Sequence, residues 1–564
     1  MGVHRAVEMV FDAPGKHEEP IYTYGPLIHN PNVLTLLKKK GISVLEDIPE
    51  EEGRGTVLIR AHGVPPDTGE KLEKAGLKVI DATCPRVIKV QTIIRKHAAK
   101  GYASIIIGDR DHPEVQGLLG YAGTMGYVVD NIDALDALPA FDKAIVVAQT
   151  TQNTFFFEKV KEWAGRKFPS YKIFHTICDS TVKRQAEVEA MALATDSVIV
   201  IGGLNSGNTK RLAEIAGKSN KPVYHIESEA DIDLNALASV RHVGITTGAS
   251  TPGWIINKVY RTLEMLPSKT SPDWRRVFFT IERTLLLTNI YISLGAGCLC
   301  YTFTRLQGIS NYFPCVLIAV LYVQSMHILN NLLRTKSDEY NDPERASFYK
   351  THKWFLAILA LMSGCAGLIL ACNIGGIAFP ALIAMSIMGL SYNLKILPKK
   401  FTKNKYLRIR DIPGSKTVLI ATAWGIVTCV FPRLTIEAGI GLQAIIVFLL
   451  STSMVFVRTA FFDILDMQGD RIVGKESIPI LMGEKKTLRV LKLVLISVCV
   501  LLLVSGFMGI ITSLGFVLVI CPLIMLTVLL IYKKRYMLPG TGLEFLVETN
   551  FILAGIITLV WSVF

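Results

Sequence analysis

The feature that most constrains this chain is a series of long apolar segments in its second half. After residue 280, nine such segments follow one another, at roughly 284–304, 312–333, 354–373, 376–394, 417–432, 439–457, 490–511, 513–532 and 544–564. Several of them are near the ~20 residues that an α-helix needs to cross a bilayer, and the segment at 417–432 is short. The sequence therefore predicts an all-α membrane domain with about nine transmembrane helices over residues 281–564.

The distribution of charge agrees with a membrane domain and excludes a nucleic-acid partner. The chain carries a net charge of +13, of which residues 277–564 contribute +12, with 26 Lys and Arg against 14 Asp and Glu. The loops after segments 2, 4, 6 and 8 are basic, whereas the opposite loops contain only Arg305 and Arg433. By the positive-inside rule, the basic loops and the domain before the membrane face the cytoplasm. We therefore expect a multi-pass protein of the bacterial inner-membrane type, with its carboxyl terminus on the far side of the lipid bilayer.

Residues 1–266 follow a different pattern, in which short Ile- and Val-rich runs lead into a polar turn and then a helical pattern. The clearest runs are TVLIRAHGV, LKVIDATCP, ASIIIGDRDHPE, KAIVVAQTTQ, DSVIVIGGLNSGNT and RHVGITTGAS. Repeated units of this kind predict an α/β domain with buried parallel strands, which binds ligands beyond the carboxyl ends of the strands. We expect residues 267–280, which begin with the basic stretch PSKTSPDWRR, to be a linker.

Eight short motifs lie at the predicted strand ends of the α/β domain: GPLIHN (25–30), RAHGV (60–64), DATCP (81–85), HPE (112–114), QTTQ (149–152), ICDSTVKRQ (177–185), NSGNT (205–209) and GAST (248–251). They contain the domain's two cysteines, Cys84 and Cys178, whose thiolates suit a soft metal or an iron–sulfur cluster. Their His, Ser and Asn side chains, with neighbouring glycines, suit an oxyanion such as phosphate. Together the motifs predict a site for a redox centre and a phosphorylated substrate.

In order and wording, these motifs resemble those of the LytB/IspH family, the 4-hydroxy-3-methylbut-2-enyl diphosphate reductases, over about residues 1–266. The resemblance implies a three-lobed reductase fold and the last step of the non-mevalonate isoprenoid pathway. In that step, two electrons and two protons remove an allylic hydroxyl and give isopentenyl and dimethylallyl diphosphates. The family also implies a [4Fe-4S] cluster, held by three cysteines with one iron open to the substrate, and an electron donor such as ferredoxin or flavodoxin.

Carried over motif by motif, the resemblance assigns a role to each site residue. Cys84 and Cys178 would be cluster ligands, and Glu114 would be the proton donor, with His112 and Thr150 beside the leaving hydroxyl. The remaining residues would bind the diphosphate: His29, His62, Ser206, Gly207, Asn208 and Ser250. Gly207 stands where a serine is common in the family, and its backbone N–H can still serve there.

The chain departs from the family pattern at its start. The family opens with a strand and a Gly-Phe-Cys-x-Gly-Val turn that supplies the first cluster ligand, whereas this chain begins Met1-Gly2-Val3-His4, immediately after the place for that cysteine. Two explanations are open: the start is assigned to an internal Met and the third cysteine lies upstream, or the domain has lost its cluster. Because the other motifs are intact, we expect the first.

The membrane half has an acidic motif of its own after the sixth apolar segment. Asp463, Asp466 and Asp470 are spaced by three and four residues, so they share one helix face and can hold Mg²⁺ against a diphosphate. With its nine apolar segments, this half resembles the UbiA superfamily of intramembrane prenyltransferases over about residues 280–564. Tyr392 and Lys395 fall where that family keeps a Tyr and a Lys near the diphosphate.

The other acidic motif of the UbiA superfamily is altered in this chain. Members carry Asn-Asp-x-x-Asp-x-x-x-Asp after the second helix, and here only Asn330 and Asp338 match, since Asn331 and Arg334 replace two carboxylates. Arg334 either binds phosphate directly in place of a metal, as a guanidinium can, or marks a transferase that no longer ionises its substrate. The sequence leaves both readings open.

Our main hypothesis is a membrane-tethered reductase fused to a UbiA-like prenyl-transfer domain. A second hypothesis makes the chain chiefly an intramembrane prenyltransferase with a vestigial reductase domain. A third makes it a non-catalytic assembly that binds prenyl diphosphates, because each half has one damaged motif.

Overall fold

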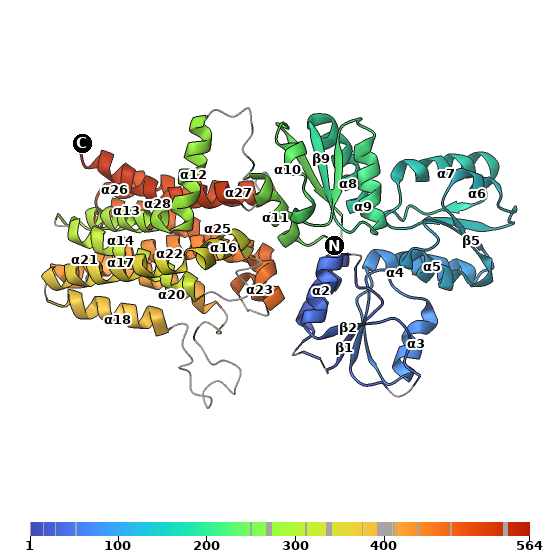
Figure 1. Ribbon diagram of the computed structural model, residues 1–564, viewed down its shortest axis with the longest axis horizontal. Coiled ribbons are helices and arrows are strands. Elements are labelled where there is room, and N and C mark those ends of the chain that lie inside the picture. The colour runs from blue at the N-terminus through green and yellow to red at the C-terminus, as the bar shows by residue number, and fades with distance from the viewer. Residues whose placement is uncertain are drawn as a thin grey trace. The chain divides into compact units, whose positions relative to one another are not determined.

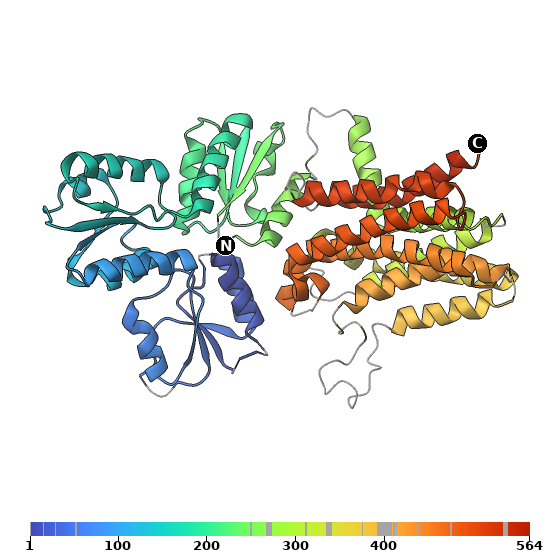
Figure 2. The same cartoon turned by 180° about the vertical axis from the view of Figure 1, so that it is seen from behind.

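The computed structural model divides the chain into two compact units, unit 1 at Met1–Thr270 and unit 2 at Ser271–Phe564. Unit 1 is an α/β structure and unit 2 is helical (Figures 1 and 2). The structure describes residues 2–14, 16–17, 19–28, 30–50, 53–248, 251–264, 266, 273–310, 313–333, 341–374, 376–391, 409, 412, 414–436, 439–473, 477–533 and 540–564.

Unit 1 contains three parallel sheets, one in each of three lobes (Figure 1). The first sheet has the order β2-β1-β3-β4, with β1 at Ile21–Tyr24, β2 at Ile42–Leu45, β3 at Thr56–Ile59 and β4 at Lys78–Asp81. The second has the order β6-β5-β7-β8, with β5 at Ala103–Ile107, β6 at Gly126–Val129, β7 at Ala144–Ala148 and β8 at Lys172–Ile173. The third has the order β10-β9-β11, with β9 at Ser197–Ile201, β10 at Val223–Ile226 and β11 at Val243–Thr247.

The sequences of the central strands explain why these sheets form. Strands β5, β7 and β9 are buried along their whole length, and they consist almost entirely of Ala, Ile and Val. Such continuous apolar runs are typical of parallel strands that are covered by helices on both faces. The predicted three-lobed α/β fold is therefore confirmed.

Helix α1 precedes the first strand, and every other helix of unit 1 follows the carboxyl end of a strand. They are α1 (Gly2–Asp12), α2 (Pro31–Lys39), α3 (Pro66–Lys74), α4 (Pro85–Ala98), α5 (Pro113–Ala122), α6 (Ile132–Asp136), α7 (Thr154–Lys167), α8 (Asp179–Ala194), α9 (Gly207–Gly217), α10 (Leu234–Leu237) and α11 (Gly253–Glu264). Four of them have a proline in the first turn, where the missing N–H costs no hydrogen bond.

The described part of unit 2 is entirely helical. Its helices are α12 (Asp273–Leu287), α13 (Ile290–Leu306), α14 (Phe313–Leu332), α16 (Pro343–Thr351), α17 (Lys353–Ile374), α18 (Ala378–Ser391), α20 (Ser415–Gly425), α21 (Phe431–Thr435), α22 (Leu442–Leu465), α23 (Met467–Val473), α24 (Ile478–Met482), α25 (Glu484–Phe507), α26 (Leu514–Leu518), α27 (Ile520–Lys533) and α28 (Thr541–Trp561). A π-helical turn, Ile426–Val430, joins α20 to α21.

Each of the nine predicted apolar segments coincides with helix, but fewer than nine helices qualify as spans. Among the described residues, seven helical stretches are long and apolar enough to cross a membrane, and an eighth qualifies if a bent pair forms one span. That pair is α12 and α13, and α18, with 14 residues, is shorter than a full span. The predicted multi-pass membrane domain is therefore confirmed, and "about nine" becomes seven or eight.

The first predicted segment differs most from expectation, because it is broken within its first turns. The stretches Val277–Leu287 and Ile290–Leu306 meet at an angle of 73°. Asn289, which lies between them, has a φ of 60°, in the left-handed region that interrupts a right-handed helix. Hydropathy averages over many residues and is insensitive to a single backbone conformation, so the sequence predicted one continuous segment there.

Candidate functional site

The site residues of unit 1 gather where a strand leads into a helix. Four predicted site residues occupy the N-cap position of the following helix, each with an extended backbone: Cys84 before α4, His112 before α5, Cys178 before α8 and Ser206 before α9. The unpaired N–H groups at a helix N-terminus favour negative charge. This placement therefore suits thiolates and the oxygens of a phosphorylated ligand.

The carboxylate of Glu114 and residue Thr150 form the best-defined contact of this site. Glu114 lies in the first turn of α5 and is 2% exposed. The backbone N–H of Thr150 donates to its Oε1 at 2.7 Å, and the Thr150 hydroxyl donates to its Oε2 at 2.8 Å. The two residues come from successive loops of the second lobe, beyond β5 and β7. The structure thus joins a residue of the HPE motif to a residue of the QTTQ motif by a direct two-point contact.

Burial raises the pKa of Glu114 above its ordinary value. The two hydrogen bonds from Thr150 and the charge of Arg211 act in the opposite direction, and the charge of Asp109 adds to the increase. Desolvation is the largest of these effects because a charged carboxylate is costly to hold away from water. Glu114 is therefore suited to carry a proton at a pH where an exposed carboxyl has lost it.

Two histidines stand beside Glu114 in this site. His112 accepts a hydrogen bond at Nδ1 from the backbone N–H of Glu114 at 3.1 Å, so in the neutral ring the proton is on Nε2. The rings of His62 and His112 meet edge to face, with their centroids 5.2 Å apart. The structure thus brings two of the predicted histidines together with the acid. The predicted ligands His29 and Ser250 lie outside the described residues.

The two cysteines of unit 1 lie on neighbouring helix ends. Arg86, two residues after Cys84, forms an ion pair with Asp179, the residue after Cys178. The backbone N–H of Cys178 also donates to the carbonyl of Thr150 at 2.9 Å, which places this cysteine next to the Glu114–Thr150 contact. Both cysteines are half-buried and neither is in a disulfide. A redox centre held by these thiolates would adjoin the acid.

The chain packs tightly against one of the two cysteines. Gly2, the first residue of α1, lies so close to Cys84 that a Cβ at Gly2 would overlap Sγ and Cβ of the cysteine. Within the described residues, no group of three or more His, Cys, Asp or Glu side chains is placed to hold a metal ion. Unit 1 therefore offers two thiolates to a cluster, those of Cys84 and Cys178.

The NSGNT loop presents an unused donor at the N-terminus of α9. Asn208 is buried, and its Nδ2 has no hydrogen-bond partner among the residues that the structure describes. Gly207 lies beside the acid loop, because a Cβ there would be 3.3 Å from Oδ2 of Asp109 and 3.7 Å from Cδ2 of His112. A buried donor without a partner is rare in folded proteins, and an oxyanion of a ligand would satisfy it. This loop therefore fits the predicted diphosphate site.

Sequence reasoning missed Arg211, which joins two lobes at the site. Its Nη2 donates to both oxygens of Asp109, at 2.8 and 2.9 Å, and its Nη1 donates to the carbonyl of Thr151 at 2.8 Å. The side chain of Arg211 is 10% exposed, and that of Asp109 is 46% exposed. Asp109 precedes Arg211 by 102 residues, so no local pattern could have linked them.

In unit 2, the first aspartate of the acidic motif is already held by other side chains. Asp463 is 2% exposed and lies near the end of α22. Lys416 Nζ lies 3.3 Å from its Oδ1, and the Thr417 hydroxyl donates to its Oδ2. Both partners come from the first turn of α20. Asp463 thus links two helices at the end of the bundle.

The other two aspartates follow at the junction of two helices. Asp466 is the C-cap of α22, and Asp470 lies in α23, where the amide of Asn341 donates to it at 3.3 Å. The described residues contain no three-carboxylate group placed for a metal, so the structure does not assemble the three aspartates around one point. The predicted residue Asn330 lies in α14. The remaining predicted ligands of this half lie outside the described residues: Arg334, Asp338, Tyr392 and Lys395.

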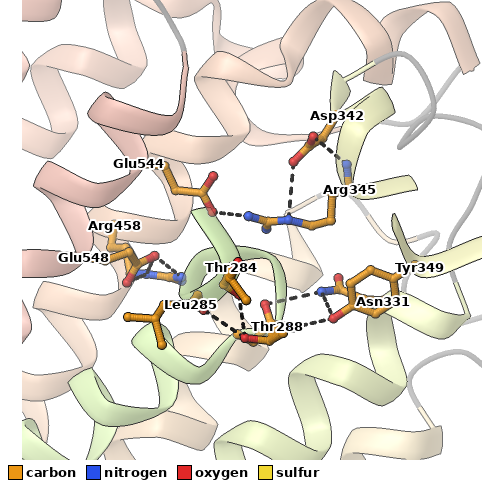
Figure 3. Close-up of polar contacts among 11 residues, drawn as sticks. Thr284, Leu285, Thr288, Asn331, Asp342, Arg345, Tyr349, Arg458, Glu544 and Glu548 are labelled. Atoms are coloured by element: carbon orange, nitrogen blue, oxygen red, sulfur yellow. Dashed lines mark hydrogen bonds and ion pairs between the residues drawn. The ribbon is translucent and has the colours of Figure 1, made fainter. Parts of the chain in front are cut away.

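Unit 2 also contains buried ion pairs, which are shown in Figure 3. Arg458 in α22 donates from Nε to both oxygens of Glu548 in α28, at 2.8 and 3.0 Å, and their side chains are 7% and 1% exposed. Arg345 in α16 pairs with Glu544 in α28 and with Asp342. Charged residues in an apolar segment are costly unless paired, and they often mark a functional site. Glu548 within an apolar segment was the sequence signal for these pairs.

Asn331, which replaces a carboxylate of the altered UbiA motif, lies in a neutral network. Its amide donates to the Tyr349 hydroxyl at 3.2 Å and to Oδ1 of Asn289 at 3.5 Å (Figure 3). Asn289 donates in turn to the same hydroxyl at 2.5 Å. Asn331 therefore helps to hold the break between α12 and α13.

Comparison with known proteins gives a separate relationship for each half. The LytB protein family matches residues 1–264, and the UbiA prenyltransferase family matches residues 290–539. The 4-hydroxy-3-methylbut-2-enyl diphosphate reductase of Geobacter sulfurreducens is 42% identical over 268 residues, which cover 48% of this chain and 94% of that protein.

Two solved structures are also similar to parts of the chain. One is an (E)-4-hydroxy-3-methyl-but-2-enyl diphosphate reductase, 39% identical, which covers 47% of this chain and 95% of its own with a TM-score of 0.38. The other is a UbiA homolog from Archaeoglobus fulgidus bound to GPP and Mg²⁺, 14% identical, which covers 49% of this chain and 99% of its own with a TM-score of 0.33. The family matches confirm both predicted resemblances: the chain belongs to the LytB family, and the same chain carries a UbiA prenyltransferase family region.

Proposed function

We propose that unit 1 reduces 4-hydroxy-3-methylbut-2-enyl diphosphate to isopentenyl and dimethylallyl diphosphates. The reaction breaks one allylic C–O bond, consumes two electrons and two protons, and releases the hydroxyl oxygen as water. The observation that carries this proposal is the buried Glu114 carboxyl, held at two points by Thr150 next to Cys178. This arrangement supplies a proton donor beside a pair of thiolates, as a reductive dehydroxylation requires.

Glu114 is the proton donor in this proposal. Its burial raises its pKa, so the protonated form persists at a pH where the reaction runs. Thr150 holds both carboxyl oxygens and thereby orients the proton toward the departing hydroxyl. His112, whose Nδ1 is occupied by the Glu114 backbone, presents Nε2–H as a further donor to the same region.

Cys84 and Cys178 would hold the iron–sulfur cluster that the LytB family implies, which we take to be [4Fe-4S]. Both are uncrosslinked and lie at helix N-termini, where a thiolate is favoured. When bound, such a cluster supplies the two electrons and a Lewis-acidic iron. Its electrons would come from a small carrier such as ferredoxin or flavodoxin.

The diphosphate of the substrate would lie at the N-terminus of α9. There the Ser206 side chain, the Gly207 backbone and the buried Nδ2 of Asn208 can donate to phosphate oxygens. His62, whose ring contacts that of His112, is placed to reach the same ligand from the first lobe. His29 and Ser250 complete the proposed set.

The proposal is tested on the protein with the upstream segment in which we expect the third cysteine, purified without oxygen and reconstituted with iron and sulfide. We expect the chain to bind iron and to convert the hydroxylated diphosphate into the two products when a low-potential reductant is supplied. A chain that binds iron and substrate but releases neither product would favour the alternative of a vestigial reductase domain.

For unit 2 we propose binding of a prenyl diphosphate with one Mg²⁺, and transfer of its prenyl group. Asp466 and Asp470 would hold the ion, because Asp463 is tied to Lys416 and Thr417. Mg²⁺ is commonly bound through one or two carboxylates together with substrate phosphates, so two aspartates suffice. Asn330, Arg334, Asp338, Tyr392 and Lys395 would contact the diphosphate. We further propose that unit 1 and the basic loops face the cytoplasm, with the carboxyl terminus on the far side.

A further inference from the structure

Helix α12 presents an apolar stripe at one end of the membrane domain. Trp274, Val277, Phe278 and Ile281 are 65%, 57%, 55% and 52% exposed. They follow the spacing i, i+3, i+4 and i+7, so they lie on one face of the helix. Four large apolar side chains exposed together on one face of a helix are rare in a protein surface that faces water, because contact between apolar surface and water is unfavourable.

The other end of α12 is anchored to the bundle. Leu286 and Leu287 are buried, and Arg283 forms an ion pair with Glu344 in α16. Only the amino-terminal part of the helix therefore carries the exposed stripe, and its position relative to unit 2 is determined by these contacts.

Hydrogen bonds from neighbouring side chains stabilise the angle between α12 and α13. At the break, the carbonyl of Thr288 accepts from the Gln324 amide at 2.8 Å, and the carbonyl of Asn289 accepts from the Ser293 hydroxyl at 2.8 Å. Asn289 is fully buried and donates to Tyr349. These two carbonyls at the break are thus paired, as buried backbone groups must be inside a membrane domain.

This geometry sets the direction of α12 relative to the bilayer. The 17 residues of α13 extend about 25 Å, at 1.5 Å per residue, and so cross most of the hydrocarbon core. Because α12 meets α13 at 73°, it runs close to the membrane plane, directly before the point where the chain enters the hydrocarbon at α13.

We propose that α12 lies in the interface of the bilayer, with Trp274, Val277, Phe278 and Ile281 inserted among the lipid acyl chains. The occupant of the stripe is lipid because α13, which follows directly, belongs to a candidate membrane span and itself exposes the large apolar side chains of Ile290 and Leu294. Tryptophan is favoured at this depth, and the sequence adds Arg275 and Arg276, which suit anionic headgroups. The first part of α12 falls in the expected linker at 267–280, so the helix holds this stretch of the chain at the membrane surface.

The test uses the fluorescence of Trp274 in the full chain. The chain is placed in nanodiscs of phosphatidylcholine and phosphatidylglycerol whose acyl chains are brominated either near the glycerol or near the methyl end. The signal of Trp274 is obtained by subtracting the Trp274→Phe variant. We expect quenching that is roughly twofold stronger with bromine near the glycerol, since interfacial helices sit at the headgroup–acyl boundary, and weak quenching by aqueous acrylamide.

Two further variants, each with a tryptophan at another position of α12, test whether only the apolar face of the helix contacts lipid. In the Trp274→Phe background, Phe278→Trp should restore quenching by brominated lipid, whereas Thr280→Trp, exposed but off the stripe, should be quenched by acrylamide instead. Strong acrylamide quenching of Trp274 would place the stripe in water. Shielding of Trp274 from both quenchers would mean that unit 1 or a second copy covers it. Either result would overturn the proposal.

Discussion

Arg211 in the third lobe of unit 1 donates hydrogen bonds to both carboxylate oxygens of Asp109 in the second lobe, at 2.8 and 2.9 Å. The same guanidinium holds the carbonyl of Thr151, the neighbour of the residue that binds Glu114. Arg211 also belongs to α9, whose N-terminus carries the proposed diphosphate ligands. One side chain therefore connects the proposed substrate loop with the proposed acid.

Replacing Arg211 should impair turnover more than folding. We expect Arg211→Met to lower kcat/KM by roughly tenfold or more, mainly through kcat, because Thr151 and Thr150 lose their support and Asp109 is left unpaired. Arg211→Lys keeps the charge but not the planar fork, so it should recover only part of the loss. In a double-mutant cycle with Asp109→Asn, the combined loss should be smaller than the sum of the single losses. Additive losses would show that the two residues act independently.

Glu114→Gln removes the transferable proton while keeping the size of the side chain. It should lower turnover by roughly 10²-fold or more, the range expected for a positioned proton donor, and leave iron content and substrate binding close to those of the parent. Glu214→Gln, an exposed change on α9, is the matched control and should have no effect. Near-normal turnover of Glu114→Gln would remove this residue from the mechanism.

The pH dependence of turnover should follow the two charges beside Glu114. The reaction needs the protonated carboxyl, so the rate falls as the pH rises through its raised pKa. Asp109 raises this pKa, so Asp109→Asn should move the falling limb to lower pH. Arg211 lowers the pKa, so Arg211→Met should move the limb to higher pH. Shifts in the same direction for both variants would contradict this account.

The two cysteines of unit 1 should be required for iron. Cys84→Ser or Cys178→Ser should reduce the iron bound after anaerobic reconstitution and abolish turnover, because serine is a poor ligand for a soft cluster. Cys365→Ser, an exposed change in α17, should leave iron content unchanged. Iron analysis and visible absorption give the answer without an activity assay. Equal iron in all three variants would place the metal elsewhere.

The membrane half should bind a prenyl diphosphate in a Mg²⁺-dependent way. Asp466→Asn should weaken this binding by roughly tenfold or more in a direct binding titration, since it removes a proposed metal ligand. Arg334→Ala should also weaken it, and Glu484→Gln, an exposed change at the start of α25, serves as the control. If Arg334→Asp improves both binding and metal stoichiometry, the arginine does not replace a metal and the motif has simply decayed.

The sequence carried enough information for the lobes and for the strand-end position of the site motifs, because both are encoded locally. Uninterrupted Ile and Val runs such as Ser197–Ile201 can form little except buried parallel strands, and the polar residue after such a run comes to the sheet edge. Glu114 and Thr150 both follow such runs, but their direct contact, across 36 residues of sequence, was not predicted.

The features that the sequence did not predict depend on single conformations or on distant partners. The break at Asn289 rests on one left-handed residue stabilised by side chains from α14 and α16. The acidic spacing of Asp463, Asp466 and Asp470 predicted one shared face, but a lysine and a threonine from α20 engage the first of them. Which of several available partners a charged side chain takes is decided by tertiary packing.

The buried pair between Arg458 and Glu548 has a consequence for how unit 2 is made in the cell. Each partner alone would cost about 2.5–3.5 kcal/mol at the centre of an inserting helix. Arg458 is synthesised 90 residues before Glu548, so α22 reaches the translocon well ahead of its counter-ion. The charge of Arg458 is therefore paired only once α28 has been translated and packs against α22. A chain truncated before α28 should therefore leave Arg458 buried without its counter-ion, and its membrane domain should be degraded faster than that of the whole chain.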